Sequence, residues 1–335
     1  MPWWRMHKQF CAATSRRAME EVDGRAERSE QATASKPVED VTRSSKRGLA
    51  PRRAIDFVRF DAANDHGRSF ASSEVARRLK EDPAFESWSR HRGIKKEITE
   101  AYAALSATRR ALRDQELERE AFGDGEDLVF VELCSGRGFI SIVFADAFPK
   151  ARLYMVDNDD RMDVTHLDAY DPDRLSFHLL DLHSAECEAF IRDIVNSAGP
   201  GKTVVLVGVH LCGTLAHRAI ELYENVDGVC ALVVSPCCLP RRRRHDVFGF
   251  HCVDIARSIT SLSPYQCWCT QLYFRIPYTS RRNMLADEDM LSTQNTFITA
   301  RKPGFGASLG SLQLEARQPT IVAGSTRAKW KILAH

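Results

Sequence analysis

Short apolar runs alternate with helical stretches from Leu128 onward, and this pattern constrains the fold more than any other feature. The runs lie at residues 128–133, 152–156, 176–180, 204–209 and 229–235, and we predict two further strands at 268–276 and 295–301. Residues 204–209 read Val-Val-Leu-Val-Gly-Val, the continuous apolar character of a strand buried on both faces. Strands alternating with helices indicate a parallel α/β sheet. The lack of a long helix between the last two strands predicts an antiparallel hairpin at one edge.

The remaining chain divides by composition. Residues 1–50 are polar and predict a disordered tail, and residues 303–335 predict a loosely attached C-terminal tail. Residues 51–122 predict a helical N-terminal extension, in which apolar side chains recur at helical spacing over about 94–120. The sheet domain is then expected at 123–302.

Charge and hydropathy exclude several classes of protein. The 335 residues carry a net charge of +2, so affinity for nucleic acid has to come from local clusters. No apolar run is long enough for a membrane-spanning helix, and no secretory signal is recognisable. We expect reduced cysteines and a cytoplasmic or nuclear protein. A mitochondrial presequence is the alternative, because Arg5, Lys8, Arg16 and Arg17 precede the first acid. The oligomeric state is not predicted.

A glycine turn follows the first predicted strand, in the segment Glu132-Leu-Cys134-Ser-Gly136-Arg-Gly138. The third glycine of a dinucleotide fingerprint is replaced by Ser141. A carboxylate at Glu132 would repel a pyrophosphate, but it suits S-adenosylmethionine, which carries a sulfonium and an ammonium.

Two further acids follow the next two strands. Asp157 stands where an acid commonly binds ribose hydroxyls, and Asp181 stands where the adenine amino group can be bound. We therefore predict a cofactor site for S-adenosylmethionine formed by Glu132, Cys134, Gly136, Gly138, Asp157 and Asp181.

Three segments together resemble one methyltransferase-domain family, over roughly residues 90–302. They are Val131-Glu-Leu-Cys-Ser-Gly-Arg-Gly138, His210-Leu-Cys-Gly213 and Pro236-Cys-Cys238. The family includes the tRNA acceptor-stem 2′-O-methyltransferase and several methyltransferase-like proteins. The resemblance implies a Rossmann-like seven-stranded sheet and S-adenosylmethionine as the methyl donor. The tRNA enzyme is expected to carry N-terminal zinc modules, whereas residues 1–90 hold one cysteine, Cys11. The resemblance therefore predicts methyl transfer rather than a tRNA substrate in particular.

The candidate catalytic residues follow the fourth and fifth strands: His210, Cys212, Pro236, Cys237 and Cys238. His210 is either a general base for a hydroxyl acceptor or a structural histidine. The cysteines are either nucleophiles that add to a pyrimidine ring or small residues lining the cofactor pocket. Ser235 and Pro236 faintly resemble the loop of amino-methylating enzymes. No metal is expected, because the cysteine spacings between 237 and 269 are not the paired spacings of zinc sites.

Four arginines follow this segment and are candidate phosphate contacts: Arg241, Arg242, Arg243 and Arg244. A solvated loop is the other interpretation. Together the patterns predict an S-adenosylmethionine-dependent methyltransferase that acts on RNA, with tRNA 2′-O-methylation as the finer prediction. The alternatives are a protein or small-molecule methyltransferase and a catalytically silent module that binds a partner.

Overall fold

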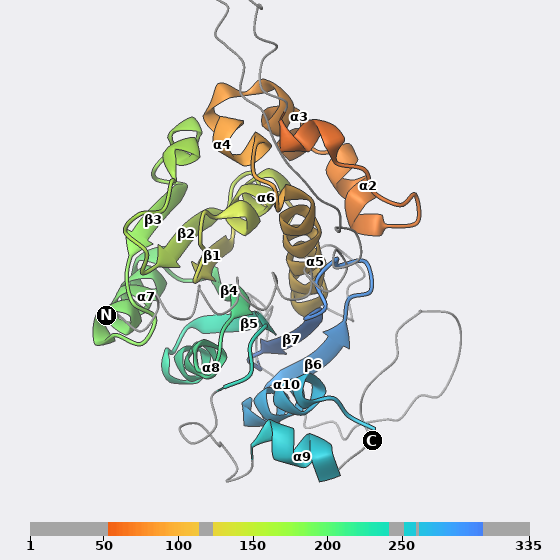
Figure 1. Ribbon diagram of the computed structural model, residues 1–335. Coiled ribbons are helices and arrows are strands. Elements are labelled where there is room, and N and C mark those ends of the chain that lie inside the picture. Colours follow the sequence, from red (N-terminus) through yellow and green to blue (C-terminus); the bar gives the residue numbers. More distant parts are fainter. Residues whose placement is uncertain (1–52, 114–122, 241–250, 259–260, 304–335) are drawn as a thin grey trace, which may run out of the picture. The chain divides into compact units, whose positions relative to one another are not determined.

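Figure 1 shows the computed structural model, which describes residues 53–113, 123–240, 251–258 and 261–303. The predicted tail at 1–50 and residues 304–335 lie outside this part of the chain. Within it, no helix is both long and apolar enough to cross a membrane.

A seven-stranded sheet organises these residues, in the order β3-β2-β1-β4-β5-β7-β6. Strands β1 to β5 pair in parallel, and β7 pairs antiparallel with both β5 and β6. The bounds are β1 Leu128–Leu133, β2 Arg152–Asp157, β3 Leu175–Leu179, β4 Thr203–Leu211, β5 Val229–Pro236, β6 Arg281–Ala286 and β7 Thr296–Arg301. This mostly parallel sheet with an antiparallel edge hairpin is the predicted Rossmann-like methyltransferase fold.

The predicted strand at 268–276 is wrong. These residues lie almost wholly in helix α10 (Pro264–Arg275), and the edge strand of the hairpin is β6 instead. The side chain of Ser263 accepts a hydrogen bond from Gln266 N, and Gln266 Oε1 accepts one from Ser263 N. This capping box, with Pro264 in the first turn, fixes a helix start. Trp268 favours a strand by propensity alone, but packing overrides propensity, since its ring is fully buried.

Side chains on the two faces of the sheet enter two separate apolar clusters. Along β4, Val205, Val207 and Val209 join one cluster, while Val204 and Leu206 join the other. This alternation follows from the two-residue period of a strand. Burial on both faces explains why the run at 204–209 reads as continuously apolar.

Helices cover both faces (Figure 1). One cluster includes side chains of α2, α3, α4, α5 and α6, and the other includes those of α7, α8, α9 and α10. The helix bounds are α2 Asp65–Ala71, α3 Glu74–Glu81, α4 Glu86–Ser89, α5 Ile94–Leu112, α6 Phe139–Ala147, α7 Ala185–Ala198, α8 Leu215–Asn225 and α9 Cys252–Ser258. Helix α5 is shorter than the predicted 94–120, and residues 114–122 lie outside the described part. The helices before β1 thus share the core of the sheet.

Candidate functional site

The strand order places a topological switch point between β1 and β4. From β1 the chain proceeds outward to β2 and β3, and it then returns to β4 on the other side of β1. Loops leaving the carboxyl ends of two such strands diverge, and the crevice between them is where open α/β sheets bind ligands. Within the described residues, only Cys134 and His210 among non-glycine residues have positive φ, at 55° and 62°. Cys134 follows β1, and His210 is the penultimate residue of β4, so backbone strain is concentrated at the switch point.

The glycine loop is held against the end of β2. Ser135 N donates to Val156 O at 3.0 Å, and Gly138 N donates to Ser135 O at 2.9 Å. Gly136 and Gly138 have φ of 56° and 76°, and a Cβ on Gly138 would lie 2.1 Å from the Met155 side chain. The positive φ therefore calls for glycine at position 138, where a Cβ would also displace the flexible end of the Met155 side chain.

Glu132 is the penultimate residue of β1 and is 4% exposed. Its Oε2 accepts hydrogen bonds from Ser141 N at 3.0 Å and from Ser141 Oγ, in the first turn of α6. Burial raises the pKa of Glu132 from its usual 4.5 to about 8, and the charges of Asp157 and Glu97 add to this rise. A cation that binds beside a buried carboxyl of this kind favours its ionised form.

We predict that Glu132→Gln flattens the pH dependence of stability. Between pH 4.5 and about 8 the unfolded chain loses a proton that folded Glu132 keeps. The contribution of Glu132 to the stability of the wild type therefore falls as pH rises across this window, by up to about 1.4 kcal/mol per pH unit. Glutamine retains an oxygen that accepts from Ser141 but does not titrate.

Urea unfolding at about pH 5.5 and about pH 7.5 measures both slopes. The variant should lose less free energy of unfolding between these two values than the wild type does. Equal losses would show that Glu132 ionises normally in the folded chain.

Asp157 ends β2 and connects the glycine loop to the loop after β2. Its Oδ2 accepts from Gly136 N at 2.8 Å, and its Oδ1 accepts from Asp159 N at 3.0 Å. A carboxylate has about four acceptor positions, so two remain for a ligand. These two hydrogen bonds orient the Asp157 carboxylate, which the sequence predicts as the ribose contact.

Asp181 and Cys134 complete the predicted cofactor residues. Asp181 is exposed two residues after β3, and its Oδ1 accepts from His183 N at 2.9 Å. Cys134 is half-buried, and burial raises the pKa of its thiol well above the usual range. The Cys134 thiol is therefore uncharged, and its environment in the glycine loop does not favour reactivity.

The helices before β1 contact the glycine loop, which the sequence did not indicate. The Arg137 guanidinium lies 4.1 Å from the centroid of the Trp88 ring, and it also donates to Ser87 Oγ. Trp88 in turn packs against Phe139, the first residue of α6, with ring centroids 4.9 Å apart. These contacts make the N-terminal extension part of the loop's support.

His210 is paired with two residues of α5. Its Nε2 lies 2.6 Å from Glu100 Oε1, and Lys96 Nζ lies 2.9 Å from the same oxygen and 3.3 Å from His210 Nε2. Burial would raise the pKa of Glu100, but the close contact and charge of His210, together with Lys96, outweigh it and lower this pKa. The His210 side chain is 34% exposed, so a substrate can reach it.

Lys96 and Glu100 are site residues that sequence reasoning missed. The helical pattern assigned charged residues of this segment to a solvent face, yet Glu100 is 2% exposed. A glutamate among Ala101, Ala103 and Ala104 is the signal that was available. A buried carboxylate needs a partner, but only the fold shows which one.

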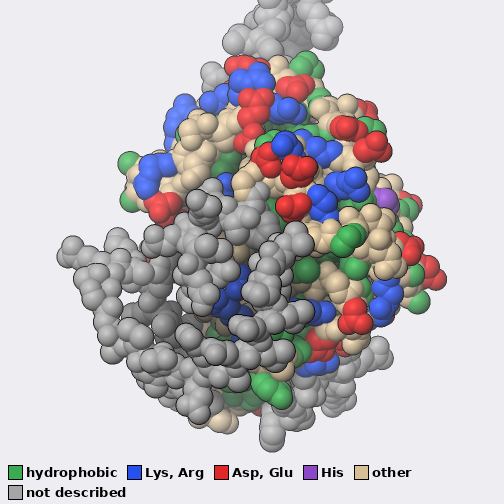
Figure 2. Space-filling view, turned by 180° about the vertical axis from the view of Figure 1, so that it is seen from behind, with side chains coloured by type: hydrophobic (Ala, Val, Ile, Leu, Met, Phe, Trp, Pro, Cys, Tyr) green, Lys and Arg blue, Asp and Glu red, His purple; other side chains and the backbone are tan. Residues whose placement is uncertain are grey.

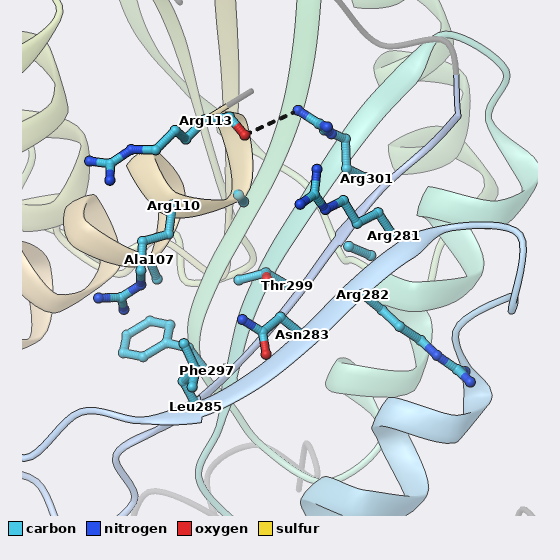
Figure 3. A pocket seen from close by; sticks show the side chains of 12 residues that line it. Ala107, Arg110, Arg113, Arg281, Arg282, Asn283, Leu285, Phe297, Thr299 and Arg301 are labelled. Atoms are coloured by element: carbon cyan, nitrogen blue, oxygen red, sulfur yellow. Dashed lines mark hydrogen bonds between the residues drawn. The ribbon is translucent and has the colours of Figure 1, made fainter. Parts of the chain in front are cut away.

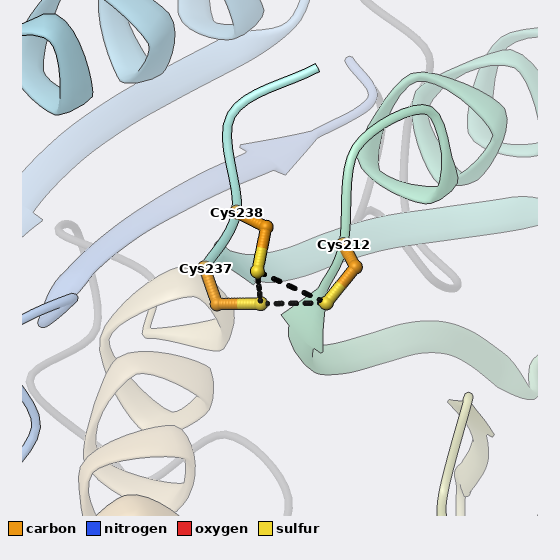
Figure 4. A group of neighbouring side chains, drawn as sticks. All are labelled: Cys212, Cys237 and Cys238. Atoms are coloured by element: carbon orange, nitrogen blue, oxygen red, sulfur yellow. Dashed lines mark hydrogen bonds between the residues drawn. The ribbon is translucent and has the colours of Figure 1, made fainter. Parts of the chain in front are cut away.

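Three of the predicted catalytic residues form a sulfur cluster (Figure 4). Cys212 Sγ lies 2.9 Å from Cys237 Sγ and 3.5 Å from Cys238 Sγ, and the last two are 3.5 Å apart. Neighbouring thiols and burial raise the pKa of Cys237 far above its usual range. A nucleophilic cysteine needs an environment that favours the thiolate, so this arrangement does not favour that interpretation of Cys237.

The other residues of the predicted cysteine-rich stretch lie elsewhere. Cys252 of α9 and both Cys267 and Cys269 of α10 are buried in the apolar cluster that these helices share with the sheet. His251 Nε2 lies 3.1 Å from Pro240 O. Pro236 is the last residue of β5, and its carbonyl accepts a hydrogen bond from Tyr265 Oη at 3.0 Å.

Arg241, Arg242, Arg243 and Arg244 lie outside the described residues. Four other arginines line a cavity of about 330 Å³ between α5 and the edge hairpin (Figure 3): Arg110, Arg113, Arg281 and Arg301. Arg282 also borders this cavity, but its guanidinium points away from it and donates to the carbonyls of Tyr273 and Ile276. Arg301 pairs in register with Ala231, near the start of β5. This position is five residues, or roughly 16 Å, from the carboxyl end of β5. On the face seen in Figure 2, acidic and basic side chains are otherwise intermingled.

Comparison of the sequence with protein-family models and with curated proteins gives no match. Among solved structures, the chain is similar to the Methanococcus jannaschii fibrillarin pre-rRNA processing protein, with 14% identity over 53% of this chain and 68% of that chain and a TM-score of 0.37. Aeropyrum pernix fibrillarin, in complex with natively bound S-adenosyl-L-methionine, shares 16% identity over 60% of this chain and 76% of that chain, with a TM-score of 0.38.

The plantazolicin methyltransferase BpumL, in complex with SAH, shares 10% identity over 71% of this chain and 94% of that chain, with a TM-score of 0.36. Because these identities and TM-scores are low, the fold is established by the strand order of the sheet. The resemblance to the tRNA-methylating family stays a prediction.

Proposed function

We propose that this chain is an S-adenosylmethionine-dependent methyltransferase. The observation that carries the proposal is the link from Asp157 to Gly136 N at the switch point of a sheet whose β7 runs antiparallel. Dinucleotide-binding sheets are commonly parallel in the order 3-2-1-4-5-6, with a third loop glycine. Here β7 enters between β5 and β6, and Ser141 replaces that glycine. Both departures favour S-adenosylmethionine over a nicotinamide cofactor.

The residues around the switch point have distinct proposed roles. Gly136 and Gly138 let the backbone approach the cofactor, and Glu132 offers a buried negative charge to its cationic groups. Asp157 accepts from the ribose hydroxyls, and Asp181 lies beside the adenine. When bound, S-adenosylmethionine supplies an electrophilic methyl group. The protein must then hold the acceptor in line with it.

His210 is the proposed base for a hydroxyl acceptor. A proton leaves the hydroxyl as its oxygen attacks, and the imidazole nitrogen receives that proton. Glu100 lies 2.6 Å from Nε2 and orients the imidazole ring. Lys96 lies 2.9 Å from the same Glu100 oxygen and offsets the negative charge of the carboxylate. This assignment makes Glu100 a positioning residue.

The proposed substrate is RNA, with a tRNA 2′-hydroxyl as the finer proposal. Two features support a polyanion: the run Arg241 to Arg244 in the sequence and the arginine-lined cavity beside the edge hairpin. The family resemblance of the three motifs supports the hydroxyl.

Transfer of a tritiated methyl group from S-adenosylmethionine into total RNA, total protein and small molecules tests this proposal, with nucleoside analysis of the labelled RNA. We expect label in RNA as a 2′-O-methyl nucleoside, and none with an Asp157→Ala variant. Label in protein alone would contradict the RNA substrate. A lack of label in RNA, protein and small molecules would support the silent-module alternative and contradict the enzyme.

A further inference from the structure

Cys212, Cys237 and Cys238 come from two loops at the carboxyl edge of the sheet. Cys212 follows β4, and the vicinal pair follows β5, the neighbouring parallel strand. Figure 4 shows the three side chains converging from these loops. Among the described residues, these three form the group of His, Cys, Asp or Glu side chains whose ligand atoms all lie within 4.8 Å of one another.

We propose that Cys212, Cys237 and Cys238 bind a zinc ion as three thiolates. Zinc accepts thiolate ligands at about 2.3 Å in tetrahedral geometry, which puts the sulfur atoms roughly 3.8 Å apart. The observed separations of 2.9, 3.5 and 3.5 Å are shorter by roughly 0.3 to 0.9 Å. Small side-chain rotations close this difference. Binding forms three sulfur–zinc bonds and releases three thiol protons to solvent.

A disulfide is the competing use of the same sulfurs. It needs a sulfur–sulfur distance of about 2.05 Å, and it would join two cysteines and leave out the third. None of the three separations is that of a bonded pair, and each sulfur lies within 3.5 Å of both others. A shared ligand for three thiols matches this arrangement better.

The backbone around the cysteines is held by contacts that do not involve sulfur. Gly213 N donates to Cys238 O at 3.2 Å, which joins the two loops directly. Leu211 is in register with Pro236, and Tyr265 Oη donates to the Pro236 carbonyl. These contacts tie both loops to each other and to the end of β5, which lowers the ordering cost of binding a metal.

The fourth coordination position is supplied from outside this trio. The described residues offer no fourth His, Cys, Asp or Glu atom within the cluster, and all three cysteines are half-buried rather than sealed. Three protein ligands with an open position are typical of zinc sites that bind water or a substrate atom. Zinc binding itself does not depend on the proposed methyl transfer.

Zinc analysis of the full-length protein by plasma mass spectrometry tests the proposal. The chain is purified reduced, without chelator, and loaded with zinc sulfate before desalting. We expect about one zinc per chain for the wild type and for Cys230→Ser, a thiol near the start of β5. Cys212→Ser, Cys237→Ser and Cys238→Ser should each bind zinc at least about tenfold more weakly.

A second measurement covers the case in which a variant does not fold. In the wild type, zinc should protect these three cysteines from alkylation, as read by peptide mass spectrometry, and chelation should remove that protection. Three outcomes would each overturn the proposal: a wild type that holds no zinc, zinc retained equally in all three variants, or a disulfide among these cysteines in the reduced preparation.

Discussion

Asp157→Ala is expected to weaken binding of S-adenosylmethionine at least about 100-fold, a loss of ~2.7 kcal/mol. Two effects combine. The ribose hydroxyls lose their proposed acceptor, and Gly136 N and Asp159 N lose the oxygens they now bind at 2.8 and 3.0 Å. Each lost hydrogen bond to a charged group is worth about 1.5–3 kcal/mol. Isothermal titration calorimetry measures the change directly.

Asp160→Ala is the matched control, because Asp160 is an exposed acid in the same loop. It should bind S-adenosylmethionine as the wild type does. If Asp157→Ala is folded by circular dichroism and keeps the wild-type affinity, the cofactor does not lie against Asp157, and the assignment of the site is wrong.

His210→Asn is expected to slow methyl transfer by about 10²- to 10⁴-fold while leaving the affinity for S-adenosylmethionine nearly unchanged. Asparagine adopts positive φ more readily than most residues, so it fits the φ of 62°. It cannot act as a base at neutral pH. Single-turnover rates with saturating cofactor isolate the chemical step from binding.

Glu100→Gln separates orientation from proton transfer. Glutamine keeps an oxygen at the position 2.6 Å from Nε2, but this oxygen carries no charge. We therefore expect a smaller loss of the methyl-transfer rate than with His210→Asn. A rate in His210→Asn equal to that of the wild type would show that His210 is structural. The acceptor would then lose its proton by another route.

Local patterns predicted the parallel part of the fold well. Buried strands such as β4 are continuous apolar runs, and glycines with positive φ mark the loop after β1. The prediction of Asp157 as a site residue rests on its place at a strand end, because parallel strands bring their carboxyl ends to one edge of the sheet. The failure at 268–276 also has a local cause. Ser263, Pro264 and Gln266 are a helix-start pattern, and the aromatic and cysteine residues that follow outweighed it.

Contacts between distant segments could not be predicted. Glu100 and His210 are 110 residues apart in the sequence, and only the packing of α5 over β4 brings them together. Cys212 lies outside the cysteine-containing segment 237–269, and only the ends of two neighbouring strands bring it beside Cys237 and Cys238. Lone residues of this kind carry no periodicity or spacing, so their role depends on the tertiary fold.

Calorimetric titration of the purified chain with S-adenosylmethionine, and separately with NAD⁺, tests the central claim most directly. We predict saturable binding of S-adenosylmethionine at one site per chain, accompanied by proton release because Glu132 ionises beside the bound cation. NAD⁺ should give no binding and no competition. Binding of NAD⁺ that displaces S-adenosylmethionine, or no binding of S-adenosylmethionine at all, would contradict the account.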